Sequence, residues 1–351
     1  MTVLEAIQKS ADFLTKKSVD SPRLQAELLL AHLLKMPRMK LYLNFERALS
    51  VTETDALREV VKRRGQREPL QHITGSTSFC GLEMAVNRHV LVPRPETEIL
   101  ADPGWEFLKH PTSNIQHPTS NEGHDGVAAG ILPAVEPGVP PGGNNAGDSE
   151  VVKIFKPSPS GKMPPSTAGG TPAATTALDF GTGSGCIAIA MAVKCPAAQI
   201  TAVDVSAEAL AVAKQNAERH GVAERIQFLK VDGSSVASPH QFDLVISNPP
   251  YIPTAEIETL QPEVGDFDPR GALDGGADGL DFYRKLAKEA AAWLKPGGKI
   301  MLEFGDGQAE AIRKIFENEK WIVEAVKDDY SRRQRILIAK SSSSSFSSST
   351  K

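Results

Sequence analysis

The stretch LDFGTGSGCIAIA, residues 178–190, decides the fold of this chain. An apolar run ends at Phe180, and glycines then stand at every second position. Glycine lets a backbone turn sharply and pass close to a ligand, and the first turn of a following helix presents free N–H groups. The stretch therefore predicts a buried strand, a ligand-binding turn and a helix. The residues expected to hold the ligand are Gly181, Thr182, Gly183, Ser184 and Gly185.

Strand and helix patterns alternate over residues 177–340. Strand patterns recur at ALDFG, QITAVD, RIQFLKVD, FDLVIS, GGKIMLEFG, WIVEAV and RILIAK. Helical patterns separate most of them, which predicts an open, mostly parallel α/β sheet with helices on both faces. Only KDDYSRRQ separates the last two strands, which predicts an antiparallel hairpin at one edge of the sheet.

The chain before this sheet shows two kinds of pattern. Apolar residues recur at helical spacing through residues 1–65, which predicts a small helical bundle with Ser50 or Thr52 as the N-cap of its third helix. Residues 66–108 begin with short apolar alternations broken by glycines, which predict a β-hairpin. The PRPETEI segment then predicts a stiff turn into a helix with an acidic first turn, and Pro103-Gly104 predicts an early break in that helix.

Two segments have a composition that resists folding. Residues 109–176 contain HPTSN twice and are rich in proline, glycine and serine, and residues 341–351 are mostly serine. Such sequences bury too little apolar surface to offset the entropy of ordering, so we expect a disordered insertion and a disordered tail.

Composition limits the possible functions. The 351 residues carry a net charge of −4, which gives no global basic field for gripping nucleic acid. Cys80, Cys186 and Cys195 are scattered, with no metal-type spacing, and we expect reduced thiols. No apolar signal core begins the chain and no stretch approaches a membrane span, so we expect a cytoplasmic protein without a metal.

The glycine spacing and two aspartates point to a particular cofactor. A dinucleotide-binding loop would have a third glycine at position 186, where this chain has cysteine. Asp204 closes the second strand, where a carboxylate can accept both ribose hydroxyls, although a helix-capping role fits it too. Asp232 can face the adenine amino group with Gly233 beside the ring, although a turn aspartate would look the same. We interpret the set as a site for S-adenosylmethionine.

The segment SNPPYIP, residues 247–253, stands at the tip of the fourth strand, facing the crevice where open α/β sheets bind ligands. The Asn248 side-chain oxygen and the Pro249 carbonyl can both accept from one NH₂ group, which aims its lone pair at a methyl donor. The prolines, including Pro250, hold these acceptors rigidly, and Tyr251 can pack against a flat substrate group. We predict a methyltransferase that acts on a planar NH₂, with these four residues as its catalytic set.

With these motifs in place, the chain strongly resembles the PrmC/HemK family, which methylates the glutamine side-chain nitrogen (N5) in the GGQ motif of peptide chain release factors. The resemblance rests on PLQHITGSTSFCGLEMAVNRHVLVPRPETEIL (69–100), LDFGTGSGCIAIA (178–190), AVDVSAEALAVAKQNA (202–217), FDLVISNPPYIP (242–253), DPRGALDGGADGLDFYR (268–284) and LKPGGKIMLEFGDGQ (294–308). It implies a class I S-adenosylmethionine-dependent methyltransferase (Rossmann-like) sheet, an N-terminal helical substrate-docking domain, a connecting β-hairpin and release factors as partners. We expect a monomer.

The same resemblance implies roles for single residues. It places cofactor contacts at Gly181–Gly185, Asp204, Gly233 and Asn248, and the substrate glutamine at Asn248–Tyr251. It also places Phe79, Arg94, Glu96 and Glu98 beside the cofactor. The chain departs from the family at Asp268, where a glutamate is usual, and in its long insertion.

Two other functions fit part of the pattern. An N6-adenine nucleic-acid methyltransferase shares the NPPY clamp but would need a base-reading domain or a basic, aromatic surface, which the sequence lacks. A non-catalytic S-adenosylmethionine-binding protein would not need Asn248 together with the glycine loop.

Overall fold

The computed structural model describes residues 1–110, 174–231 and 241–342. The expected insertion and tail therefore lie almost entirely outside the described residues, as do Asp232 and Gly233. At the margins the expected boundaries shift by one residue, because helix α6 includes Lys109, strand β3 includes Thr176 and strand β9 includes Ser341. Within these ranges no helix is both long and apolar enough to cross a membrane.

The N-terminal region is helical, as the spacing of its apolar residues predicts. Its helices are α1 (Val3–Lys16), α2 (Pro22–Leu33), α3 (Arg38–Tyr42), α4 (Val51–Gly65) and α5 (Leu70–Thr74). The N-cap of α4 is Ser50, whose side chain accepts from the Glu53 N–H while the Glu53 carboxylate accepts from the Ser50 N–H. This reciprocal capping box satisfies two helix-end donors and decides between the two expected N-caps. A two-stranded antiparallel hairpin follows, made of β1 (Ser76–Phe79) and β2 (Leu82–Ala85).

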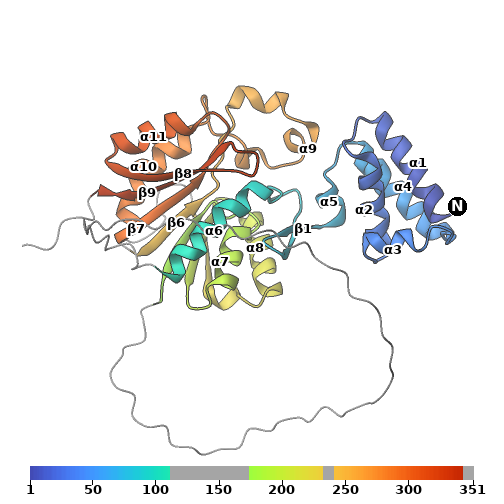
Figure 1. The fold of residues 1–351 in the computed structure, drawn as a ribbon, viewed down its shortest axis with the longest axis horizontal. Helices are drawn as coiled ribbons and strands as arrows, with labels where there is room; N and C mark the ends of the chain where they lie inside the picture. The colour runs from blue at the N-terminus through green and yellow to red at the C-terminus, as the bar shows by residue number, and fades with distance from the viewer. Residues whose placement is uncertain (111–173, 232–240, 343–351) are drawn as a thin grey trace, which may run out of the picture. The chain divides into compact units, whose positions relative to one another are not determined.

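A seven-stranded sheet forms the rest of the fold (Figure 1). Its strands are β3 (Thr176–Phe180), β4 (Gln199–Asp204), β5 (Ile226–Lys230), β6 (Phe242–Ser247), β7 (Leu294–Glu303), β8 (Trp321–Asp328) and β9 (Gln334–Ser341). They lie in the order β5-β4-β3-β6-β7-β9-β8. The first five strands in this order pair in parallel, whereas β9 runs antiparallel to β7 and β8. The expected hairpin at one sheet edge is confirmed.

Helices cover both faces of this sheet, because its strands are apolar on both sides. In β6, Leu244 and Ile246 join one buried cluster while Val245 joins the other. The first cluster includes side chains from α6 (Pro95–Lys109), α7 (Cys186–Lys194) and α8 (Ala207–Arg219), and the second includes side chains from α10 (Asp281–Trp293) and α11 (Ala309–Asn318). The remaining elements are the short helix α9 (Pro262–Gly265) and single turns at Ala223–Arg225, Thr254–Thr259 and Arg270–Ala272.

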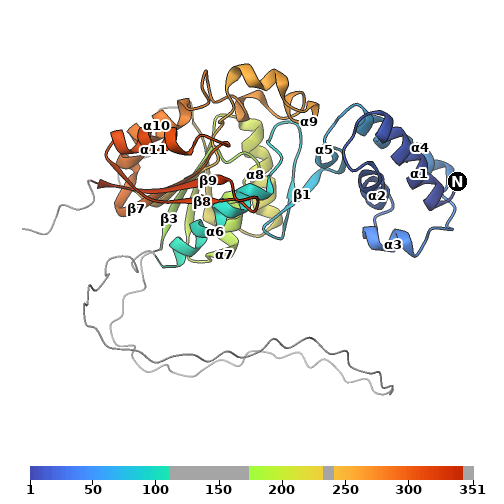
Figure 2. The same cartoon turned by 45° about the horizontal axis from the view of Figure 1, so that its top comes forward.

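Helix α6 corrects one expectation, since it continues through Pro103 to Lys109 without breaking at Pro103-Gly104. Proline inside a helix removes one N–H donor and usually costs stability. Here Leu100, Ala101, Gly104, Phe107 and Leu108 are all buried, and Figure 2 shows α6 lying beside α7. Gly104 also needs to be small, because a Cβ there would lie 3.0 Å from the Ile246 side chain. We attribute the intact helix to this packing, which offsets the missing hydrogen bond.

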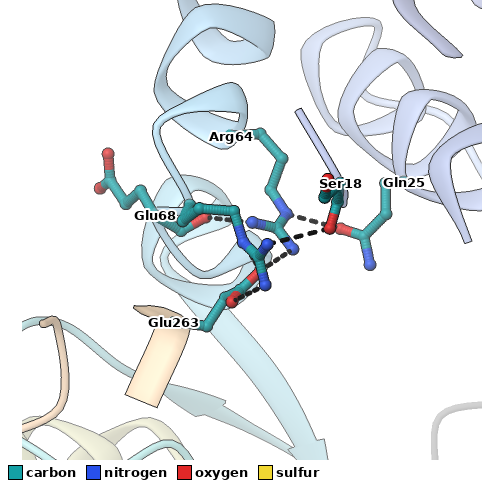
Figure 3. A network of polar contacts seen from close by, with 6 residues as sticks. Ser18, Gln25, Arg64, Glu68 and Glu263 are labelled. Atoms are coloured by element: carbon teal, nitrogen blue, oxygen red, sulfur yellow. Dashed lines mark hydrogen bonds and ion pairs between the residues drawn. The ribbon is translucent and has the colours of Figure 1, made fainter. Parts of the chain in front are cut away.

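Charge pairs join the end of α4 and the residues just after it to α9 (Figure 3). Arg64 donates to Glu263 at 2.8 Å, and Arg67 donates to both oxygens of the same carboxylate at 2.7 and 2.6 Å. Partial burial acts to raise the pKa of Glu263, but hydrogen bonds from Arg67 and Arg64 outweigh it and leave that pKa lowered. The Arg64 side chain is only 5% exposed, so this cation depends on its partners.

We expect the substitution Glu263→Gln to loosen this junction. Replacing a carboxylate that accepts charge-assisted hydrogen bonds weakens a contact by about 1.5–3 kcal/mol. Hydrogen exchange at residues 262–266 and in the last turn of α4 should therefore quicken. Glu258→Gln is the matched control, because its carboxylate lies in the same segment but is 81% exposed beside Arg270. Equal exchange in the two variants would contradict a structural role for the charge pairs.

Candidate active site

The predicted site residues gather where three neighbouring parallel strands end. The glycine loop follows β3, Asp204 ends β4, and Asn248 follows β6. Strand β3 pairs with both β4 and β6, so all three groups lie at the carboxyl edge of the sheet. The chain order reverses between β3 and β6, and such a switch point is where open α/β sheets bind ligands.

The three glycines of the loop have left-handed backbones but serve two purposes. A Cβ on Gly181 or Gly183 would meet nothing within 4 Å, so a ligand can approach the backbone there. A Cβ on Gly185 would lie 3.0 Å from Ala213, so this glycine allows the loop to pack on α8. The open space at the first two glycines fits a cofactor that lies against the loop.

Asn216 of α8 fixes this loop to the hairpin. Its Nδ2 donates to the Ser184 carbonyl at 2.9 Å and to the Ala85 carbonyl at 3.0 Å, and its Oδ1 accepts from the Ala85 N–H at 2.7 Å. The side chain is fully buried. Local sequence spacing does not reveal this residue, because the pairing depends on a contact between distant segments.

Asp179 is a second site residue that was not predicted from the sequence. Its Oδ2 accepts from the Thr182 hydroxyl at 2.7 Å and from the Ala188 N–H at 3.1 Å, which ties the loop to the first turn of α7. Burial raises the pKa of Asp179 to about 7, although these hydrogen bonds oppose the shift. An acid inside the apolar run ALDF was the available signal, since such a charge needs dedicated partners.

Asp204 lies directly beside the loop. Its Oδ2 accepts from the Gly183 N–H at 2.9 Å, and its Oδ1 accepts from the Ser206 N–H at 2.9 Å. The structure thus brings together two of the expected cofactor elements. A carboxylate offers about four acceptor positions, so Asp204 keeps capacity for further donors.

Hydrogen bonds from two other segments hold the chain at the Asn248–Tyr251 turn. Gln308 Nε2 donates to the Tyr251 carbonyl at 2.9 Å, and the Gly275 N–H donates to the Ile252 carbonyl at 2.9 Å. A Cβ on Gly279 would lie 2.4 Å from the Tyr251 carbonyl oxygen, so only glycine fits there. The DGGADG segment, residues 274–279, therefore packs directly against the backbone of this turn.

A cavity of about 250 Å³ opens beside the turn. Its polar lining consists of Arg94, Glu96, Asn248, Tyr251, Glu303 and Arg335, and the other lining residues are apolar. Of these, Glu303 and Arg335 were not predicted. They stand on β7 and β9, whose contribution to the site depends on strand order and could not be read from local spacing.

The structure also shows the surroundings of the other residues that the resemblance singles out. Arg94 donates to Asp268 at 2.8 Å, and burial raises the pKa of Asp268 to about 6 although the Arg94 charge opposes the shift. Phe79 is fully buried in the core. Glu98 accepts from the Cys80 N–H and lines a separate cavity with Cys80 and Trp105. The three cysteines are free thiols, and burial raises the pKa of Cys80 to about 12.

This combination of sheet order, glycine loop, strand-end acid and rigid turn defines a class I S-adenosylmethionine-dependent methyltransferase. Residues 168–261 match the family model described as Methyltransferase small domain, and residues 5–75 match the model described as PrmC N-terminal domain.

Curated relatives define the family more closely. A release factor glutamine methyltransferase of Geobacter sulfurreducens is 36% identical over 315 residues, covering 90% of this chain and 88% of the relative. One of Chlorobaculum tepidum is 36% identical over 341 residues, covering 96% of each chain. One of Caulobacter vibrioides is 34% identical over 316 residues, covering 90% of this chain and 88% of the relative. This chain belongs to the release factor glutamine methyltransferase family.

We expect Asp204→Ala to weaken S-adenosylmethionine binding. Loss of a charge-assisted acceptor for the ribose corresponds to about 1.5–3 kcal/mol, or roughly 10- to 150-fold in Kd. Calorimetry with the cofactor alone measures this loss. Asp243→Ala is the control, since that carboxylate accepts from the Thr176 N–H and Lys295 at the amino-terminal edge of the same sheet. An unchanged affinity in Asp204→Ala would place the ribose contact elsewhere.

Proposed function

We propose that this protein transfers the methyl group of S-adenosylmethionine to the side-chain amide nitrogen (N5) of the glutamine in the GGQ motif of peptide chain release factors. The observation that carries this proposal is Asn248, which lies on a rigidly backed turn beside the glycine loop and a cavity. The names of the family's curated members support the same substrate. On this proposal the protein acts as a monomer in the cytoplasm, where release factors work.

The cofactor and substrate share the carboxyl edge of the sheet. We assign the cofactor to Gly181–Gly185, Asp204 and Asn248, with Asp232 and Gly233 as the expected adenine contacts. When bound, S-adenosylmethionine supplies a methyl group attached to a sulfonium sulfur. After transfer, the rest of the cofactor is a neutral thioether, which is a good leaving group. The protein therefore needs no general acid for the leaving group.

The main obstacle to this reaction is the weak nucleophilicity of an amide nitrogen, whose lone pair is delocalised into the carbonyl. In the proposal, the Asn248 Oδ1 and the Pro249 carbonyl each accept a hydrogen bond from one of the two N–H groups of the substrate amide. This fixes the nitrogen and stabilises the positive character that it gains during transfer. The nitrogen then loses one of its two protons to solvent, which leaves a neutral N-methyl amide. Tyr251, whose phenol pKa burial raises to about 12, stays neutral and packs against the amide plane.

The direct test is to incubate the protein with labelled cofactor and purified release factor, and to locate the label by mass spectrometry. We expect one methyl group, on the glutamine of the GGQ motif. A release factor with that glutamine replaced by alanine should stay unlabelled. Label on a nucleic acid in place of the release factor would support the adenine-methylating alternative.

We expect Asn248→Ala to abolish methyl transfer while the protein stays folded. Cofactor affinity should fall less than turnover, because the side chain acts mainly on the attacking nitrogen. A variant that kept more than about a tenth of the wild-type kcat, a barrier change of roughly 1.4 kcal/mol, would contradict this mechanism. Asn318→Ala, at the exposed end of α11, controls for loss of an asparagine and should behave as wild type.

A further inference from the structure

The side chain of Asn248 is held from behind by two buried residues. Its Nδ2 donates to the Thr97 hydroxyl oxygen at 3.0 Å. The Glu303 carboxylate lies beside both side chains, which as hydrogen-bond donors act to lower its pKa, and its Oε2 is buried without a partner of its own. Thr97 comes from the first turn of α6 and is 3% exposed, and Glu303 ends β7 and is 2% exposed.

The chemistry of these partners fixes which end of the amide faces them. A carboxylate only accepts hydrogen bonds, so the Asn248 atom that faces Glu303 must be the nitrogen. A Thr97 hydroxyl that turns its one proton toward the neighbouring carboxylate can only accept from Asn248, which is the direction of the 3.0 Å contact. The Asn248 NH₂ group therefore faces the protein, and its Oδ1 is the atom left for the substrate.

We propose that Thr97 and Glu303 are positioning residues, which hold the Asn248 side chain with its oxygen toward the substrate amide. This inference rests on the proposed function. An Asn248 amide turned by 180° would present NH₂ to the substrate NH₂, and two donors cannot bond each other. The two residues thus select the one orientation in which Asn248 accepts from the attacking nitrogen.

The surroundings of Glu303 make this orientation sensitive to pH. Burial raises the pKa of Glu303 to about 7, the nearby Glu96 adds to the shift, and Arg335 and the hydrogen bonds from Thr97 and Asn248 oppose it. The neighbouring phenols of Tyr251 and Tyr283 have raised pKa values and stay neutral. A protonated Glu303 becomes a donor and can bond Oδ1 in place of Nδ2. Since the carboxylate is the orienting form, kcat should rise as the pH increases through about 7.

Substitution of Thr97 tests the positioning role without removing any group that touches the substrate. We expect Thr97→Val to lower kcat by roughly tenfold or more, with KM for the release factor and the cofactor Kd within about twofold of wild type. Thr97→Ser restores the hydroxyl and should restore kcat. The matched control is Thr176→Val, which loses hydroxyl bonds to Gln241 and Asp243 at the opposite edge of the sheet.

A spectroscopic measurement tests the same inference without cofactor or substrate. In protein labelled with ¹⁵N at asparagine, the side-chain resonance of Asn248 is the one lost in Asn248→Ala. Its NH₂ protons should exchange slowly in the wild type and faster in Thr97→Val. Its shift should titrate with a midpoint near the Glu303 pKa, about 7, and should not titrate in Glu303→Gln.

These results separate the inference from the proposed function. If the wild-type protein methylates release factor but Thr97→Val keeps its kcat, the positioning role is wrong. The same holds if Glu303→Gln keeps the wild-type rise of kcat between about pH 6 and pH 8. If the wild-type protein leaves the release factor unmethylated, the proposed function fails, while the nitrogen resonance still reports whether Thr97 and Glu303 hold Asn248.

Discussion

The parallel pairing of β3 with β6 is the constraint on which the rest of the site depends. Leu178 pairs with Val245 and Asp179 with Ile246, so the two strands end together. The buried Ser247 hydroxyl then donates to the Phe180 carbonyl at 2.6 Å and joins the two strand tips. The glycine loop and Asn248 leave the sheet from these adjacent points. A slip of one residue would move one partner by about 3.3 Å and reverse the faces of its side chains, so the buried pattern fixes the register.

Three carboxyl groups around this site are buried, which disfavours their charged forms. Burial raises the pKa of Asp179 and Glu303 to about 7 and that of Asp268 to about 6. Because these values exceed those of an unfolded chain, the three groups favour folding most at low pH and lose that contribution as the pH rises through 6 to 7. Each one holds part of the site in return: Asp179 the glycine loop, Glu303 the Asn248 amide and Asp268 the cavity wall at Arg94.

The sequence predicted those features that local chemistry determines. Apolar runs and glycine spacing located the strands of the sheet and the ligand loop, because each pattern carries its own physical reason. The continuous α6 was missed because its stability comes from packing on β6 and α7, which outweighs the local effect of Pro103. Asn216, Glu303 and Arg335 were missed for a related reason, since their partners lie on segments far away in the sequence. Asp179 could have been found, since an acid inside a buried strand is itself a signal.

The described residues on either side of 111–173 lie away from this chemistry. Strand β3 begins at Thr176, on the amino-terminal edge of the sheet. The end of α6 packs near the same edge, where the ring of Phe107 lies under the ammonium group of Lys299. Lys299 belongs to β7 and pairs with Leu244, near the start of β6. All of the proposed reacting groups lie at the opposite, carboxyl edge. Between Lys109 and Thr176 the fold therefore offers an attachment point for foreign sequence. A fluorescent reporter or affinity tag joined at these two residues would enter and leave the core fold at the edge opposite the glycine loop and the Asn248–Tyr251 turn.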